Sequence, residues 1–88
     1  MNIEFTGILL RAANNNRTVT VDAATFAAAL AELTTRFPSM DRVLLDNTGN
    51  LRKAHRVFLN GELVPHPDRA MPLGTGDRIE FFTAVAGG

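Results

Sequence analysis

The sequence predicts a two-layer α+β domain in which a mixed sheet of about five short strands packs against one main helix. Several short stretches alternate apolar and polar residues, which is the period of a half-buried strand. One stretch, residues 25–37, changes to the period of 3.6 that is typical of a helix. At 88 residues, the chain is long enough for a single domain with one modest core.

The composition narrows the class of protein. Nine basic and nine acidic residues cancel, which argues against nucleic acid as the main partner. The chain has no cysteine, so disulfides, thiolate zinc sites and thiol nucleophiles are excluded. No stretch approaches the roughly 20 apolar residues of a membrane span, and no secretory signal is recognisable. We therefore expect a cytoplasmic protein with no membrane partner.

The first part of the chain is predicted to form a β-hairpin. Residues 2–10 combine strand alternation with an apolar run, and Gly7 interrupts them as an expected bulge. Residues 13–16 contain three asparagines, which favour a turn. Residues 17–21 then alternate again and are rich in β-branched side chains, which predicts the second strand.

The main helix is predicted over residues 25–37. Thr25 is a suitable N-cap, because its hydroxyl can accept from an early free amide. Pro38 ends the helix, since the residue before a proline is pushed out of the helical region. Large apolar residues spaced four, three and four apart form one stripe of this helix: Phe26, Leu30, Leu33 and Phe37.

Turns and short strands follow the helix. One helical turn is expected between Asp41 and Leu45, and residues 46–50 are a strong turn signal. A third strand at 55–59 leads into Asn60-Gly61, the favoured dipeptide of a two-residue hairpin turn, and a short return strand follows at 62–64.

The final strand is predicted at residues 78–83. With it, the order of elements is that of the ubiquitin-like β-grasp fold. The helix is expected to cover the sheet face that carries Phe5, Val19, Val57, Leu59, Ile79 and Phe81.

The end of the sequence is unusual. The predicted last strand passes without a polar linker into small residues and then into Gly87-Gly88. With Gly at about 7% of average usage, such a pair at a chain end arises by chance roughly once in 200 sequences. We therefore divide the chain into a β-grasp domain, residues 1–83, and a flexible C-terminal tail, residues 84–88.

Four segments together give the chain a recognisable resemblance. They are the helix end Leu33–Pro38, the strand and turn Val57–Gly61, the turn Leu73–Asp77 and the end Phe82–Gly88. On these segments the chain resembles the MoaD/ThiS family of small sulfur-carrier proteins over essentially its full length. One departure is Thr83, where many relatives carry proline.

The resemblance implies a protein co-substrate that is not itself an enzyme. In that family, an adenylyltransferase related to ubiquitin-activating enzymes joins the terminal carboxylate to AMP from ATP. Sulfur from a sulfurtransferase or from sulfide then displaces AMP and leaves a thiocarboxylate. A biosynthetic enzyme accepts the sulfur for molybdopterin, cysteine, thiazole or a specialised metabolite. The resemblance thus implies that the chain binds no cofactor and that the partner enzyme uses ATP.

The residues of the tail suit this chemistry. A terminal carboxylate, with a pKa near 3.5, is ionised at neutral pH and resists nucleophilic attack until it is adenylated. Gly88 is therefore the predicted reactive residue. Gly87 and Gly88 lack side chains and fit a narrow channel, and the residues before them keep the tail slim: Ala84, Val85 and Ala86.

Two surface features are candidate docking sites. If Ile79 and Phe81 point inward, alternation turns Phe82 outward as an interface anchor; the alternative is that Phe82 packs under residues 39–54. The basic cluster of Arg52, Lys53 and Arg56 is either a patch that docks on an acidic partner or a solvated face.

Other functional readings are weaker or remain open. His55 and His66 lack metal-ligand spacing, so both are expected at the surface and no metal site is predicted. A ubiquitin-like modifier conjugated to lysines would be activated in the same way. The small subunit of a molybdopterin-synthase-like complex and a plain β-grasp binding module are further alternatives.

Overall fold

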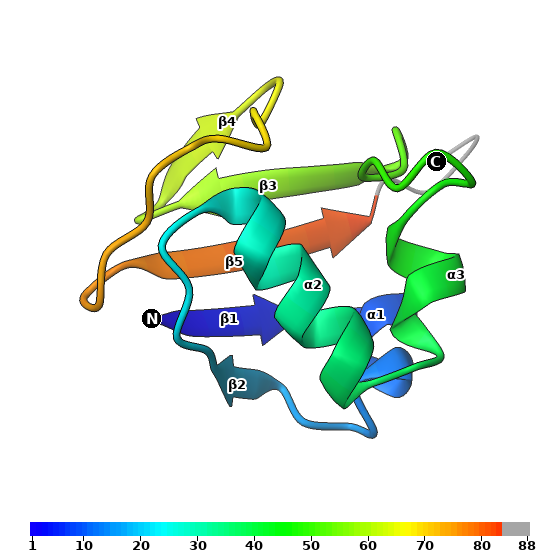
Figure 1. Cartoon of the computed structure of the whole chain (residues 1–88). Helices are drawn as coiled ribbons and strands as arrows, with labels where there is room; N and C mark the ends of the chain where they lie inside the picture. The colour runs from blue at the N-terminus through cyan, green and yellow to red at the C-terminus, as the bar shows by residue number, and fades with distance from the viewer. Residues whose placement is uncertain (84–88) are drawn as a thin grey trace.

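A computed structural model describes residues 1–83 of the chain and shows a five-stranded sheet with one long helix across one face (Figure 1). The strand order is β2-β1-β5-β3-β4. β1 and β5 are parallel and the other neighbours are antiparallel, so the predicted mixed sheet is confirmed. The strands are β1 (Asn2–Phe5), β2 (Thr18–Thr20), β3 (His55–Leu59), β4 (Glu62–Val64) and β5 (Arg78–Thr83).

The predicted first strand is wrong beyond Phe5. The chain turns at Gly7, whose φ of 60° suits a residue without a side chain, and then forms the short helix α1 (Ile8–Ala12). Leu9 and Ala12, three residues apart, are the buried residues of this helix. The apolar run after Gly7 was thus helical, and β1 and β2 are joined through α1 in place of a short polar loop. The turn predicted at residues 13–16 is present, and Asn14 and Asn15 adopt positive φ in it.

The main helix α2 (Phe26–Arg36) agrees with the prediction. The Thr25 hydroxyl accepts from the Ala28 amide at 3.2 Å and caps the helix. Phe37 follows as the C-terminal cap, immediately before Pro38. All members of the predicted stripe are buried against the sheet: Phe26, Leu30, Leu33 and Phe37.

The core lies between α2 and the sheet. Phe81 of β5 stacks on Phe5 of β1 with ring centroids 5.9 Å apart, and it contacts Phe26 of α2 at 6.3 Å. The other residues predicted on this face are also buried, except that Leu59 is only partly buried: Val19, Val57 and Ile79. The central strand β5 is therefore fixed from both layers.

A small helix, α3 (Met40–Leu44), stands where one helical turn was expected. The predicted turn at 46–50 is confirmed, because the Asp46 carboxylate accepts from the Thr48 amide, the Thr48 hydroxyl and the Asn50 amide. These hydrogen bonds, led by the Thr48 hydroxyl, lower the pKa of Asp46. The side chain of Asp46 therefore holds the turn of the loop before β3 together.

The turn between β3 and β4 is tied to the start of β5. Asn60 and Gly61 have φ of 53° and 86°, as the favoured hairpin turn requires. The Asn60 side chain donates to Asp77 at 3.0 Å and accepts from the Arg78 amide at 2.9 Å. Asp77 also accepts from the Gly74 amide at 2.7 Å. Hydrogen bonds therefore join the β3–β4 turn to the turn at Leu73–Asp77 before β5.

Candidate functional site

The candidate site lies at the end of β5, from which the predicted tail continues. β5 pairs with β1 on one side and with β3 on the other, so the point where the domain ends is set by two ladders of the sheet. The tail residues themselves lie outside the described residues: Ala84, Val85, Ala86, Gly87 and Gly88. The observed β5 has the bounds predicted for the last strand, whereas the division into domain and tail stays a prediction.

Phe82 lies on the outer face of the sheet, as alternation predicts. Ile79 and Phe81 are buried, whereas 39% of Phe82 is exposed. The Phe82 ring meets Phe58 of β3 edge-on, with centroids 5.3 Å apart and planes at 83°. The alternative in which Phe82 packs under residues 39–54 is therefore wrong, and its exposed aromatic surface stands one residue before the end of β5.

Phe58 was missed by sequence reasoning. Its position beside Phe82 depends on the pairing of β3 with β5, in which Arg56 faces Phe82 and Phe58 faces Glu80. Alternation within residues 55–59 does place Phe58 on the face opposite Val57, which would have been a usable signal. The outer face near the tail therefore presents two aromatic rings with Arg56 beside them.

His55 is not at the surface as predicted, because its side chain is 7% exposed. It lies two residues before the buried Val57, on the same face of β3, and so points inward. The ring nitrogen Nδ1 lies 3.1 Å from the Thr83 hydroxyl, and Nε2 lies 2.5 Å from the Val43 carbonyl oxygen. Since a carbonyl oxygen only accepts, Nε2 donates to Val43, and Nδ1 shares a hydrogen bond with the Thr83 hydroxyl. His55 thus ties the last residue of β5 to α3.

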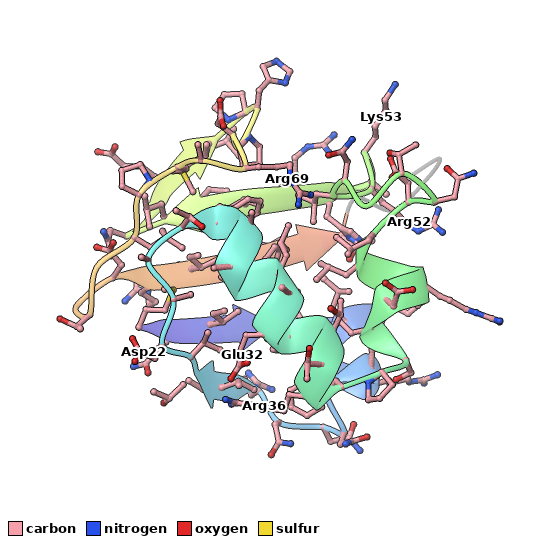
Figure 2. All side chains as sticks on the ribbon, viewed as in Figure 1. Asp22, Glu32, Arg36, Arg52, Lys53 and Arg69 are labelled. Carbon is pink, nitrogen blue, oxygen red and sulfur yellow. The ribbon has the colours of Figure 1, made fainter. Side chains whose placement is uncertain are left out.

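The basic residues predicted as a cluster do lie together, in and after the loop that leads to β3 (Figure 2). Arg52 donates from Nε to the Arg42 carbonyl oxygen at 2.7 Å, and Arg56 donates from Nη1 to that of Lys53 at 2.6 Å. Arg69, which sequence reasoning missed because it lies 13 or more residues away, joins them through a hydrogen bond to the Gly49 carbonyl at 2.8 Å.

The described residues offer no other chemical centre. Within residues 1–83, no group of three or more metal-ligating side chains comes together. His66 is exposed, as predicted, whereas His55 is occupied by the hydrogen bonds above. None of the helices in this part of the chain is both long enough and apolar enough to cross a membrane.

A mixed five-stranded sheet crossed by one main helix, with its central last strand leading into the tail, defines a ubiquitin-like β-grasp domain. The profile of the ThiS family matches residues 3–88, and the chain belongs to this family. The MoaD/ThiS resemblance and the predicted fold class are therefore confirmed. This is a family of small carrier proteins that are not catalysts.

Solved structures support the same fold. Haloferax volcanii SAMP1 is 28% identical, with a TM-score of 0.85 over 100% of this chain and 98% of that one. A chain of the Amycolatopsis orientalis BexX/CysO complex is 22% identical, with a TM-score of 0.84 over 99% and 98% of the two chains. Mycobacterium tuberculosis CysO is 21% identical, with a TM-score of 0.82 over 96% and 98%. Curated proteins gave no match.

Proposed function

We propose that this protein is a sulfur carrier whose Gly88 carboxylate is adenylated and then converted to a thiocarboxylate. The observation that carries the proposal is the ThiS-family match, which runs through β5 and on to Gly88. The exposed Phe82 beside the end of β5 supports it, because it offers an anchor next to the tail.

The proposed reaction proceeds in two displacements. A carboxylate oxygen of Gly88 attacks the α-phosphorus of ATP in the partner's active site, and pyrophosphate leaves. With sulfide as the donor, HS⁻ then attacks the acyl carbon, AMP leaves with the bonding electron pair, and loss of the proton leaves the thiocarboxylate. The first step is needed because the ionised carboxylate has no adequate leaving group of its own.

In this proposal the chain supplies a substrate and a docking surface. Phe82 and the basic cluster meet the adenylyltransferase, and Ala84 to Gly87 pass through its channel. The partner holds ATP, a sulfurtransferase or sulfide supplies sulfur, and a biosynthetic enzyme takes it from Gly88. Dependence on ATP favours the cytoplasm as the compartment.

The test is alkylation of the activated chain. The protein is incubated with a candidate adenylyltransferase, ATP and sulfide, treated with a thiol-reactive alkylator, and measured as intact mass. Because the chain has no cysteine, a single adduct mapped to the terminal peptide reports a thiocarboxylate. Alkylation is essential, since oxidation of one of the three methionines would mimic the mass change from oxygen to sulfur. Deletion of Gly88 is the control, and an adduct that survives it contradicts the proposal.

A second candidate function is protein modification. Similarity to SAMP1, a small archaeal modifier protein, favours it. Activation would be the same, but the acyl carbon would end as an amide on a lysine of a target protein. Lys53 is the single lysine of this chain, so any chain of linked copies would pass through that residue. Conjugates that depend on Gly88 and resist thiols, without an alkyl adduct, would favour the modifier.

A further inference from the structure

A cavity of about 680 Å³ lies at the edge of the sheet, between α2, the loop before β3 and the residues around the end of β4. Its apolar wall includes Leu30 of α2, Leu51 of the loop between α3 and β3, and Leu63 of β4. Leu63 is 50% exposed, although it belongs to a strand. The cavity lies where β4 ends at Val64 and the chain continues through Pro65, so the start of β3 has no strand beside it on that side among residues 1–83.

The charges around this cavity are strongly one-sided. Of nine basic and nine acidic residues in a neutral chain, four basic residues and no acidic residue line it. Within residues 1–83, none of the four forms an ion pair. Asp46 lies close enough to Arg52 to interact, but its carboxylate is occupied by Thr48 and Asn50. The four basic residues, called here the cationic rim, are Arg52, Lys53, Arg56 and Arg69.

The three arginines of the rim are held in place by the backbone. Arg52 and Arg69 each donate one hydrogen bond to a carbonyl oxygen, that of Arg42 and that of Gly49, and Arg56 donates two, to those of Lys53 and His55. A guanidinium has five N–H donors, so each arginine keeps several for a ligand. Figure 2 shows Arg52, Lys53 and Arg69 at different places along this flank. The positive charges are thus anchored apart around an apolar wall.

We infer that this cavity binds an acidic segment of a partner protein, in which an aliphatic or aromatic side chain contacts the apolar wall and flanking carboxylates meet the cationic rim. Charge complementarity selects an acidic ligand, because the rim has no carboxylate of its own. Anchoring at separate carbonyls favours charges spread along a chain over one compact phosphate, which needs converging donors. The site does not involve Gly88, so peptide binding can be measured without the adenylation and sulfur-transfer steps.

The experiment is selection from a phage-displayed library of random peptides on the full chain, followed by affinity measurement on one selected synthetic peptide. We expect selected peptides to be enriched in Asp and Glu around an apolar residue. Arg69→Glu should weaken binding by about tenfold or more, and binding should fall as salt is added. Arg17→Glu is the matched control, because it changes net charge equally at an exposed residue outside the cavity, and it should alter affinity by less than about twofold.

A second variant of the rim separates a loss of peptide binding from a loss of the folded structure. Arg69 holds the Gly49 carbonyl, whereas the Lys53 side chain makes no hydrogen bond within residues 1–83, so Lys53→Glu should weaken the peptide with an unchanged melting temperature. The inference is overturned if no acidic enrichment appears, or if Arg17→Glu weakens binding as much as the two rim variants. It is also overturned if inorganic tripolyphosphate displaces the peptide at lower concentration than the peptide itself binds, since the site would then be a phosphate site.

Discussion

At the scale of single residues, the half-buried Asp77 connects three parts of the chain. Its carboxylate accepts from the Asn60 side chain and from the Gly74 amide, while its carbonyl accepts from the Asn2 amide. One residue therefore joins the β3–β4 turn, the turn before β5 and the first strand. The bond from Asn60, followed by that from Gly74, lowers the pKa of Asp77 below its ordinary value.

Asp77→Asn should lower the melting temperature at neutral pH. The melting temperature of the variant should also depend less on pH than that of the parent. A carboxyl whose pKa is depressed in the folded state stabilises the fold above its unfolded pKa, near 4, and that contribution is lost as pH falls through the folded pKa. The difference between variant and parent should therefore shrink on acidification from pH 7 to pH 3. Far-UV circular dichroism is suitable, because the chain has no Trp or Tyr. Asp22→Asn is the control, and an equal effect there would contradict the assignment.

His55 gives a second prediction at this scale. His55→Leu keeps an apolar side chain in the buried position but leaves the Val43 carbonyl and the Thr83 hydroxyl without their partner. The loss of a buried hydrogen-bond partner should cost about 1–3 kcal/mol in the free energy of unfolding. Urea denaturation followed by circular dichroism measures this cost. His66→Leu, at an exposed position, should change stability little, and comparable losses in both variants would refute the buried role of His55.

At the scale of elements, α2 is the piece whose packing holds the two layers together. Leu33 is fully buried at the centre of its apolar stripe. Leu33→Ala should therefore cost about 2–5 kcal/mol through lost burial and the cavity left behind, a large part of the stability of so small a domain. Leu63→Ala removes the same atoms from an exposed side chain and is the matched control. Equal midpoints in urea for the two variants would rule out the proposed packing.

The elements also show why sequence reasoning succeeded in some places and failed in others. α2 was predictable because a cap, a period and a proline agree locally, and the Asn60-Gly61 hairpin because its dipeptide favours one turn. The short apolar run after Gly7 is compatible with strand or helix, and the contacts of α1 with α3 and β5 decided it. His55 and Phe58 required knowledge of which strands pair. Arg69 is distant in the sequence from the other residues of the cationic rim, and only the tertiary fold places it beside them.

At the scale of the whole molecule, the two ends of β5 are fixed by different parts of the chain. Asp77, just before β5, is tied to Asn60, and Thr83, the last residue, is tied to His55. Between them, β5 pairs with β1 and β3 and buries Phe81 under α2. In the proposed activation, the partner therefore meets a last strand that is already held at both ends, which reduces the entropy cost of ordering the docking surface.

Docking through Phe82 gives the last prediction. Phe82→Ala should weaken activation by the cognate adenylyltransferase, because it removes an exposed aromatic next to the tail while the buried face of β5 stays intact. Ile8→Ala is the matched control, since Ile8 is also an exposed large apolar residue, at 52%, but lies in α1. The rate of thiocarboxylate formation, read as the alkyl adduct, and the melting temperature are measured for both. A slower rate in Phe82→Ala alone, at an unchanged melting temperature, assigns Phe82 to the interface. A large fall in its melting temperature would instead make the contact with Phe58 structural, and equal rates would place docking elsewhere.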